Sequence, residues 1–537
     1  MQNSVPEGSS GMNEFASLQS WQPPGSQNYG ATAPTASTAQ FLQTPGNISA
    51  KRSYLAVGVL CYINLLNYMD WFIVPGVLVD IKKYFNISDG SAGLLQTVFI
   101  LFFLLSAPFF GYLGDRYNRK VILSAGIFLW SGATLGSSFI TESYSWIFFL
   151  SRGFVGIGTA SYSTIAPTII ADLFEKDQRT CMLSVFYIFI PVGSGLGYVL
   201  ASSVTQAAGH WHWAFRITPC MGVIAVALLI LLVPGPTQDA AEGHGGQSIT
   251  STTQGADKKP GVQSTASTTW CEDVKSLSKN RSFVWSSLGV TAMAFVTGAL
   301  GLWVPVFLSR AQLFHDLVPP CLQEPCNSST SLIFGGITIV TGIVGVITGA
   351  GVARRYKKIN AKADPLICAV GMFSSAPCLY LSIMLATQSI LATYIFIALG
   401  EFFLALNWAI VADILLYVVI PKRQSTAVAL QIFMSHLLGD AGSPYFIGII
   451  SDALQTRQND SHLGAFRSLQ YSFILCAFIG VLGGGFFLLT ALHVEEDREE
   501  AQQLCRGKTC ILIFMMLLTE TQKLLLKWHM ANLHPRL

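Results

Sequence analysis

Four ionisable side chains lie inside long apolar segments, and these residues are the most able to do chemistry: Asp70, Arg152, Glu401 and Asp440. A charge at the centre of a membrane helix costs roughly 2.5–3.5 kcal/mol even on the mildest scale, so such residues face a cavity or one another. Their chemistry would be recognition of a charged ligand or exchange of a proton. No enzyme and no cofactor are predicted, because the sequence has no nucleophile elbow, no phosphate-binding glycine loop and no zinc-type Cys and His spacing.

Helical spacing places these residues on polar stripes of four segments. The stripes are Asn64, Asn67 and Asp70 or Trp71; Arg152, Gly156, Thr159 and Ser163; Glu401 and Trp408; and His436 and Asp440. Residues three, four or seven apart share one helix face, so each segment has one polar side. We expect the four stripes to line a central path.

Hydrogen bonding between helices is the alternative to substrate contact for every stripe. Both interpretations stay open for the two asparagines, Ser163 and Trp408. The cost of burying a charge favours a functional role for Asp70 and Arg152, with a salt bridge between them as the alternative. His436 is expected to be an interior histidine whose hydrogen bonds are satisfied.

The elements that position these stripes must be membrane helices. The chain has 537 residues, of which 51% are hydrophobic and 11% charged, and its mean hydropathy is +0.50. Soluble proteins carry about 25% charged residues. Apolar runs of about 20 residues, long enough to cross a bilayer, begin near Tyr54, Leu94, Val121, Tyr144, Met182, Trp213, Phe283, Ser331, Pro365, Ile390, Ala427 and Leu469. The prediction is an all-α integral membrane protein, with twelve transmembrane helices in two pseudo-symmetric six-helix bundles.

These runs divide the chain into five regions. They are a disordered cytosolic amino-terminal tail at 1–52, a six-helix bundle at 53–235, a cytosolic linker at 236–279, a second six-helix bundle at 280–493 and a cytosolic carboxy-terminal tail at 494–537. The linker is rich in Gly, Ser, Thr and Gln, which is typical of a flexible connection. The end of the second tail is either a short interfacial helix or unstructured. A net charge of +3 gives no basic field that would indicate a nucleic-acid partner.

Basic residues gather in the loops after spans two, four, eight and ten, which by the positive-inside rule predicts that both termini and the linker are cytosolic. The outer loops then include Cys321 and Cys326, beside a glycosylation pattern at 327–329. These cysteines are expected to form a disulfide, because that pattern requires an oxidising compartment. The WHWAFR string at 211–216 is expected to anchor span six in the aromatic belt. Arg310 either meets an anionic headgroup or snorkels to the interface.

A loop of glycines and fixed charges lies between spans two and three. It reads GYLGDRYNRK from Gly111 to Lys120 and contains Asp115, Arg116 and Arg119. In spacing and position it resembles the signature loop of the major facilitator superfamily, and a weaker echo of it follows span eight. The resemblance implies that these residues gate the cytosolic side.

Two acidic residues at cytosolic helix ends are grouped with this gate. Asp172 lies at the end of span four, where we expect it to pair with Arg116. Asp413 lies at the end of span ten, and Ala412-Asp413 repeats the dipeptide that ends span four. A solvated charge at the interface is the alternative for Asp413.

Four longer strings resemble the spinster family within that superfamily. They are NLLNYMD at 64–70, ASYSTIAP at 160–167, IPVGSGLGY at 190–198 and HLLGDAGSP at 436–444, and the likeness extends from about Ala56 to Leu492. Within the family the chain resembles a vertebrate branch, spinster homologue 3. The resemblance implies a carrier of lysophospholipids or sphingolipids.

Two positions depart from the commoner pattern of this family, in which acidic residues in spans one and four are implied to couple transport to protons. Asp70 and Arg152 are present, but Thr159 stands where the second acidic residue would be, and Trp71 replaces an arginine. A threonine cannot titrate. The sequence therefore leaves open whether transport is proton-coupled or facilitative.

The resulting prediction is a transporter of lysolipids or sphingolipids, such as sphingosine-1-phosphate, that works by alternating access. The substrate and coupling set is Asp70, Arg152, Thr159, Glu401, Asp440 and Arg310. The alternatives are a carrier of a small polar solute and a non-transporting membrane sensor or scaffold. We expect a monomer among membrane lipids, in the plasma membrane or an endolysosomal membrane.

Overall fold

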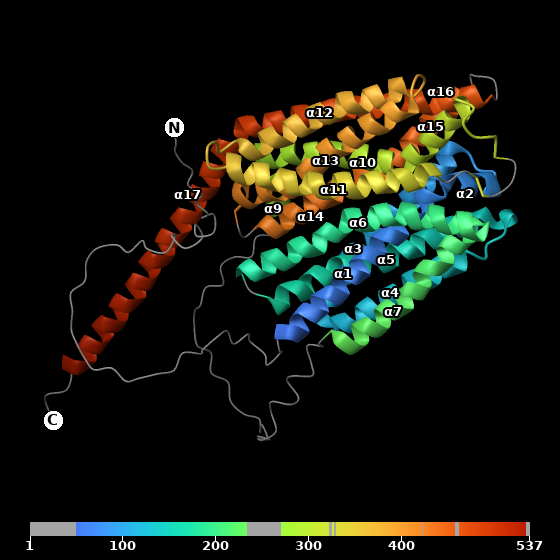
Figure 1. The fold of residues 1–537 in the computed structure, drawn as a ribbon. Helices are drawn as coiled ribbons and strands as arrows, with labels where there is room; N and C mark the ends of the chain where they lie inside the picture. Colours follow the sequence, from blue (N-terminus) through green and yellow to red (C-terminus); the bar gives the residue numbers. More distant parts are fainter. Residues whose placement is uncertain are drawn as a thin grey trace, which may run out of the picture. The chain divides into compact units, whose positions relative to one another are not determined.

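The computed structural model describes residues 50–174, 176–233, 270–321, 325–326, 329–420, 423–456 and 461–532, without the side chains of a few of these residues and of 505–532. Helices account for most of the described residues, and no strand occurs among them (Figure 1). The first half consists of α1 (Ala50–Gly76), α2 (Leu78–Phe85), α3 (Asp89–Arg116), α4 (Arg119–Ser137), η1 (Glu142–Tyr144), α5 (Ser145–Leu173), α6 (Lys176–Ala208), η2 (Trp211–Trp213) and α7 (Ala214–Leu232). The second half consists of α9 (Trp270–Leu277), α10 (Arg281–Phe314), α11 (Ser329–Tyr356), α12 (Ala363–Leu385), α13 (Ile390–Val418), α14 (Gln424–Ser435), η4 (His436–Asp440), α15 (Gly442–Gln455), α16 (His462–Ser472) and α17 (Ile474–Asn532).

The predicted fold class is confirmed. Six long helical segments occur in each half if α14, η4 and α15 are taken as one segment and α16 and α17 as another. Ten of these segments, within the described ranges, are long and apolar enough to cross a membrane. The other two are α5 and the eleventh segment, in which the π-helical turn η4 separates α14 from α15.

The helices begin where the sequence supplies polar caps. Ser88, Asn118 and Asn280 each accept a hydrogen bond from a backbone N–H of the first helical turn, at the starts of α3, α4 and α10. Ser389 and Ser461 do the same for α13 and α16. Such caps satisfy donors that have no partner inside the helix, so they fix where each span starts.

The helices pack in two groups that correspond to the two halves. In the first half α1 packs against α6 and α7, and α5 packs against α3 and α4; in the second, α10 packs against α17, and α13 packs against α11 and α12. The halves meet along two helix pairs, α6 with α11 and α3 with α15. Figure 1 shows α6 and α11 side by side where the green and yellow parts of the chain meet.

Glycine makes the α3–α15 contact possible. A Cβ atom at Gly93 would lie 2.3 Å from the carbonyl oxygen of Pro444, and one at Gly448 would lie 2.4 Å from the carbonyl oxygen of Asp89. Both distances are too short for any side chain. The two backbones therefore touch at the end of the helices that we predict to face outward, which we call the outer end, in the manner of small-residue contacts between membrane helices.

The structure shows helix in two regions that the sequence predicted as linker and tail. The last part of the predicted flexible linker is helical, because α9 covers Trp270–Leu277, and Arg423 donates to Asp273 at 2.7 Å and to Ser276 at 2.6 Å. The backbone of α17 (Ile474–Asn532) also stays helical beyond 493, through most of the predicted carboxy-terminal tail at 494–537. Residues 1–49 of the predicted tail and residues 236–269 of the predicted linker lie outside the described residues.

Candidate functional site

Asp70 lies inside the amino-terminal bundle and is 2% exposed. Its carboxylate accepts hydrogen bonds from Thr134 Oγ1 of α4 at 3.1 Å and from Thr218 Oγ1 of α7 at 3.0 Å. Its charge interacts with that of Arg152, but no ion pair joins these two described side chains. The salt bridge that the sequence left open is therefore absent from this structure, and two hydroxyl groups hold the carboxylate instead.

Arg152 of α5 is 1% exposed, and it is the largest polar side chain among those that are fully buried in the described part of the chain. Its Cζ atom lies 5.2 Å from the centre of the Phe99 ring of α3. Neither Nη1 nor Nη2 has a hydrogen-bond partner among the described residues. A buried guanidinium without an acceptor carries a large desolvation cost, so the site is incomplete as it stands.

Trp71 of α1 packs among aromatic side chains of α1 and α3. Its ring makes an edge contact with Phe99 at 4.5 Å and another with Phe103 at 5.8 Å, and it stacks on Tyr68 at 5.8 Å. Trp71 and Arg152 therefore contact the same phenyl ring. The surroundings of Arg152 thus include aromatic side chains of α1 and α3, which are suited to an apolar chain next to a charged group.

The polar residues earlier on α1 differ from each other. Asn64 Nδ2 donates to Phe186 O of α6 at 2.9 Å. Of the two interpretations left open for Asn64, this contact agrees with hydrogen bonding between helices rather than with substrate contact. Asn67 is 2% exposed, and neither atom of its amide has a partner among the described residues. An unpaired buried amide costs about 1–3 kcal/mol, which favours substrate contact for Asn67. Thr159 is also buried, at 2% exposed.

The second half places its polar groups on α11, α13 and η4. Glu401 of α13 accepts hydrogen bonds from Thr338 at 3.3 Å and from Thr341 at 3.1 Å, both on α11. His436 and Asp440 pair within the π turn, at 2.9 Å between Nδ1 and Oδ2. Trp408, by contrast, is 49% exposed. His436 thus has the partner expected of an interior histidine.

One ring contact joins α3 of the first half to the polar π turn of the second half. Phe103 of α3 makes an edge contact with His436 at 5.7 Å between ring centres. No hydrogen bond between described side chains joins the α1 and α5 stripes to Glu401 or Asp440. A common path lined by all four stripes therefore stays a prediction.

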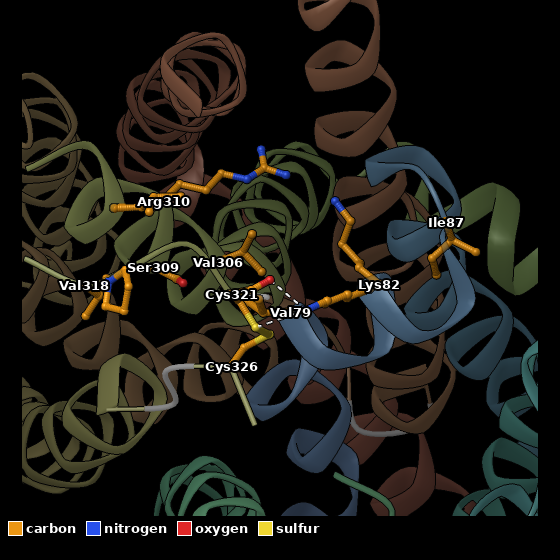
Figure 2. A pocket seen from close by; sticks show the side chains of 12 residues that line it. Val79, Lys82, Ile87, Val306, Ser309, Arg310, Val318, Cys321 and Cys326 are labelled. Atoms are coloured by element: carbon orange, nitrogen blue, oxygen red, sulfur yellow. Dashed lines mark hydrogen bonds between the residues drawn. A yellow bond between two sulfur atoms is a disulfide. The ribbon is translucent and has the colours of Figure 1, made fainter. Parts of the chain in front are cut away.

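The strongest polar contacts between the halves converge on Asp89, which is 1% exposed at the start of α3. Its carboxylate pairs with Lys82 of α2, with Arg310 Nη2 of α10 at 2.7 Å, and accepts from Ser451 Oγ of α15 at 2.6 Å. Figure 2 shows Lys82 and Arg310 extending toward one another from their separate helices. Arg310 is therefore an ion-pair partner at the junction of the halves in this structure. This contact is neither with an anionic headgroup nor a snorkelling contact with the interface, the two roles expected from the sequence.

A second carboxylate reaches across the same junction. Asp452 of α15 accepts from the backbone N–H of Asp89 at 2.9 Å and of Gly90 at 2.7 Å. It therefore caps the first turn of α3 from the other half, where a negative charge is favoured by the helix dipole. Together Asp89 and Asp452 close the outer end.

The loop between α10 and α11 adds a covalent element to this end. A disulfide joins Cys321 and Cys326. Lys83 of α2 donates to Cys321 O at 2.7 Å, and the backbone N–H of Cys326 donates to Asp80 of α2 at 2.8 Å. The disulfide loop of the second half is thus held against α2 of the first half. Asn327 and Ser328, which begin the glycosylation pattern, lie outside the described residues.

At the inner end, ion pairs form within each half. Arg119 pairs with Asp172, and its Nε also donates to Gly114 O at 3.1 Å, while Arg116 lies over Tyr112 at 4.5 Å from its ring centre. The predicted pairing of Asp172 with Arg116 is therefore wrong, because Arg119 at the start of α4 faces the end of α5.

The second half repeats this arrangement with a lysine. Lys357, just after α11, lies 2.7 Å from Asp413 of α13 and 2.9 Å from Asp364 of α12. Although partial burial acts in the opposite direction, these two carboxylates raise the pKa of Lys357. Asp413 is thus an ion-pair partner as well as an interfacial charge.

The remaining residues of the predicted gate make fewer described contacts. Gly111 has open space around the position of a Cβ atom, and Lys120 is half-buried. The side chain of Asp115 lies outside the description. The gating role of this loop therefore stays a prediction.

Comparison with known proteins supplies the family. The Major Facilitator Superfamily matches residues 60–439. Spinster homolog 3 of Mus musculus is 60% identical over 479 residues, which cover 89% of this chain and 90% of that protein. Spinster homolog 1 of Homo sapiens is 56% identical over 467 residues, which cover 87% and 86%. The chain belongs to the spinster family of the major facilitator superfamily. It is accordingly a multi-pass membrane transporter and not an enzyme.

Solved structures agree with this fold. A bacterial homolog of the human lysosomal transporter Spinster, in an inward-facing and unoccupied conformation, superimposes with a TM-score of 0.69 at 19% identity, covering 84% of this chain and 99% of that one. A D-xylose-proton symporter has a TM-score of 0.56 at 16% identity, covering 82% and 97%. At such identities the likeness concerns the fold alone.

In this spinster chain, the polar contacts between the halves lie toward the outer end for all side chains that the structure describes. Thr97 Oγ1 donates to Ala441 O at 2.6 Å, and Tyr198 donates to Gly301 O, in addition to the contacts of Asp89 and Asp452. The structure therefore represents a state whose outer end is closed. Sequence reasoning missed Asp89 and Asp452, because each resembles an ordinary acidic residue at a helix end.

Proposed function

We propose that this transporter carries a single-chain amphiphilic lipid with a phosphate-bearing head, such as a lysophospholipid or sphingosine-1-phosphate, by alternating access. The observation that supports it is the fully buried guanidinium of Arg152, whose two Nη groups have no acceptor among the described residues. Those two groups can donate to one phosphate in a bidentate manner. An anionic substrate head would complete the site.

The surroundings of Arg152 favour an amphiphile over a small polar solute. Phe99 lies against the guanidinium, and Trp71 and Phe103 extend this aromatic surface. A sugar or small organic anion needs several polar contacts, whereas a lipid needs one charged contact and an apolar wall for its chain. Asn67, with its amide unpaired among the described residues, provides a further polar contact for a lipid headgroup.

The acidic residues have separate roles in this proposal. The charge of Asp70 balances that of Arg152 from a distance while two threonines hold it in place. Glu401 and Asp440 face the second half of the path, and Arg310 maintains the outer closure. Since Thr159 cannot exchange a proton, the carrier works as a facilitator that runs down the lipid gradient. It acts as a monomer among membrane lipids.

The experiment is uptake of sphingosine-1-phosphate and lysophosphatidylcholine into vesicles that contain the purified chain. Arg152→Ala is expected to lower the rate of lipid uptake by roughly tenfold to a hundredfold, because it removes a charge-assisted hydrogen bond to the substrate. Arg152→Lys should retain part of the rate, because it keeps the charge but not the fork of donors. Arg467→Gln, which removes another half-buried arginine, should transport as the wild type does.

Three results would contradict the proposal. Equal lipid transport by Arg152→Ala and the wild type would show that Arg152 does not bind the substrate. Faster uptake of a sugar or organic anion than of either lipid would favour a polar-solute carrier. Absence of any switching between outer-open and inner-open accessibility would favour a sensor or scaffold.

A further inference from the structure

A second cluster of donors lies at the outer end of the amino-terminal bundle, apart from Arg152 and from the junction of the halves. A cavity of about 290 Å³ is bounded there by α2, the segment after α4, η2 and the first turn of α7. Its polar lining consists of Tyr84, Ser138, Thr141, His210, His212 and Arg216, and its described lining residues include no carboxylate. The volume is near the lower limit of small-molecule sites, about 300 Å³, which fits a headgroup rather than a whole lipid.

Arg216 is held in place with its terminal donors unused. Its Cζ atom lies 4.9 Å from the centre of the Phe139 ring and 4.8 Å from that of Trp213, and its Nε donates to Ser138 Oγ at 3.3 Å. No other hydrogen bond to Arg216 is found among the described residues. A guanidinium whose position is set by rings and by Nε can offer Nη1 and Nη2 to one phosphate with little further loss of entropy.

Ring contacts also fix the imidazole beside it. His212 stacks on Trp211 with ring centres 4.0 Å apart and makes an edge contact with Tyr84 at 5.0 Å. The His212 imidazole and the Thr141 hydroxyl of the lining add donors to those of Arg216 around this cavity. Several donors, one fixed cation and no competing carboxylate are the arrangement that binds a phosphate.

The surface around this cavity indicates where the phosphate comes from. Phe139 is 66% exposed, Trp146 63%, Tyr144 54% and Trp213 46%. Exposed aromatic side chains at one end of a membrane bundle lie at the level of the lipid headgroups. We infer that this cavity binds the phosphate of an outer-leaflet glycerophospholipid, whose acyl chains lie along the exposed aromatic surface. The lipid joins α2, η2 and α7 at the rim of the bundle and is not the transported substrate.

Binding is tested with the full-length chain, purified in detergent, stripped of lipid and titrated with dioleoyl phosphatidylglycerol under native mass spectrometry. Arg216→Gln is expected to weaken binding by about tenfold to a hundredfold, and Arg216→Lys by less, because one charge without a fork remains. Arg467→Gln, at the same outer end of the other half, is the matched control and should bind as the wild type does. If Arg216→Gln does not fold, the Arg216→Lys comparison decides.

Two further ligands separate a lipid site from a simple anion site. Dioleoylglycerol, which has the same chains but no phosphate, should not bind the cavity, and an excess of glycerol 3-phosphate should not displace the lipid. The inference is overturned if Arg216 variants bind as Arg467→Gln does, if dioleoylglycerol binds equally well, or if glycerol 3-phosphate competes fully. Loss of lipid binding in the Arg216 variants, together with normal lipid transport, would support a site separate from that of Arg152. If only Arg152→Ala loses lipid transport, the inference stands.

Discussion

Arg310→Gln is expected to open the outer end of this transporter. Arg310 donates from Nη2 to the buried carboxylate of Asp89 in the other half at 2.7 Å. The same arginine donates from Nη1 to Ala465 O within its own half, so that bond is lost equally in both conformations. Only the contact across the halves changes the balance between the closed and open states.

The magnitude follows from that single contact. A hydrogen bond between charged groups contributes about 1.5–3 kcal/mol, and Asp89 is 1% exposed, so solvent screening is small. The ratio of outer-open to outer-closed molecules should therefore rise by roughly tenfold to a hundredfold. Lys82→Gln is the matched control. It removes the other cation from Asp89, but Lys82 and Asp89 belong to the same half. The contact of Lys82 with the other half is a cation–π contact with Trp303 at 6.0 Å, the outer limit of that interaction, so the ratio should change little.

Distances between spin labels at the exposed positions Ser143 and Gln388, at the outer ends of the two halves, report the two states. Arg310→Gln should increase the population at long distance, and Lys82→Gln should not. An equal shift in both variants would show that the total positive charge around Asp89, rather than the contact across the halves, keeps the outer end closed. No shift in either variant would refute the closing role of Asp89.

Three other outcomes are expected from the same structure. Gly93→Ala should lower the melting temperature, since overpacking typically costs about 1–3 kcal/mol. Gly136→Ala should not lower it, because the space around its Cβ position is open. Equal melting temperatures of the two variants would contradict the tight contact of α3 with α15. Lys357→Gln should destabilise the inner end in a thermal melt by leaving two carboxylates without their cation, and its exposed neighbour Lys358→Gln should not. Because the pKa of Lys357 is raised, this stabilisation is present at neutral pH and is lost only as an alkaline pH passes that pKa. Thr159→Glu should make lipid transport depend on a proton gradient, and a variant whose rate is independent of pH would count against Thr159 as the missing coupling position.

Periodicity was sufficient to predict the fold class. Apolar runs of about 20 residues leave no alternative to membrane helices, because the backbone must satisfy its own hydrogen bonds in lipid. The same information could not place the ends of α17, since a helix can continue past the membrane with polar residues. Nor did composition identify α9, whose contacts with Arg423 form only when the linker meets the start of α14.

The residues of the site were partly within reach of the sequence. Burial of Asp70 and Arg152 follows from their position in apolar segments, and both are buried in the structure. Their partners do not follow, because Thr134 and Thr218 belong to helices that are distant in sequence. Likewise, the partner of Asp172 depends on which of two nearby arginines faces the end of α5, and helical spacing alone does not decide that.

By itself, the sequence determined that this protein is a twelve-helix transporter of the spinster family with charges placed inside the membrane, since hydropathy and motif spacing are local properties of the chain. Only the tertiary structure decided which charges are satisfied. Asp70 has two hydroxyl donors, Arg310 has Asp89, and Arg152 has no acceptor among the described residues. The reason is physical: whether a buried charge has a partner depends on the packing of helices from distant parts of the chain, and we propose that a substrate binds at the charge left without one.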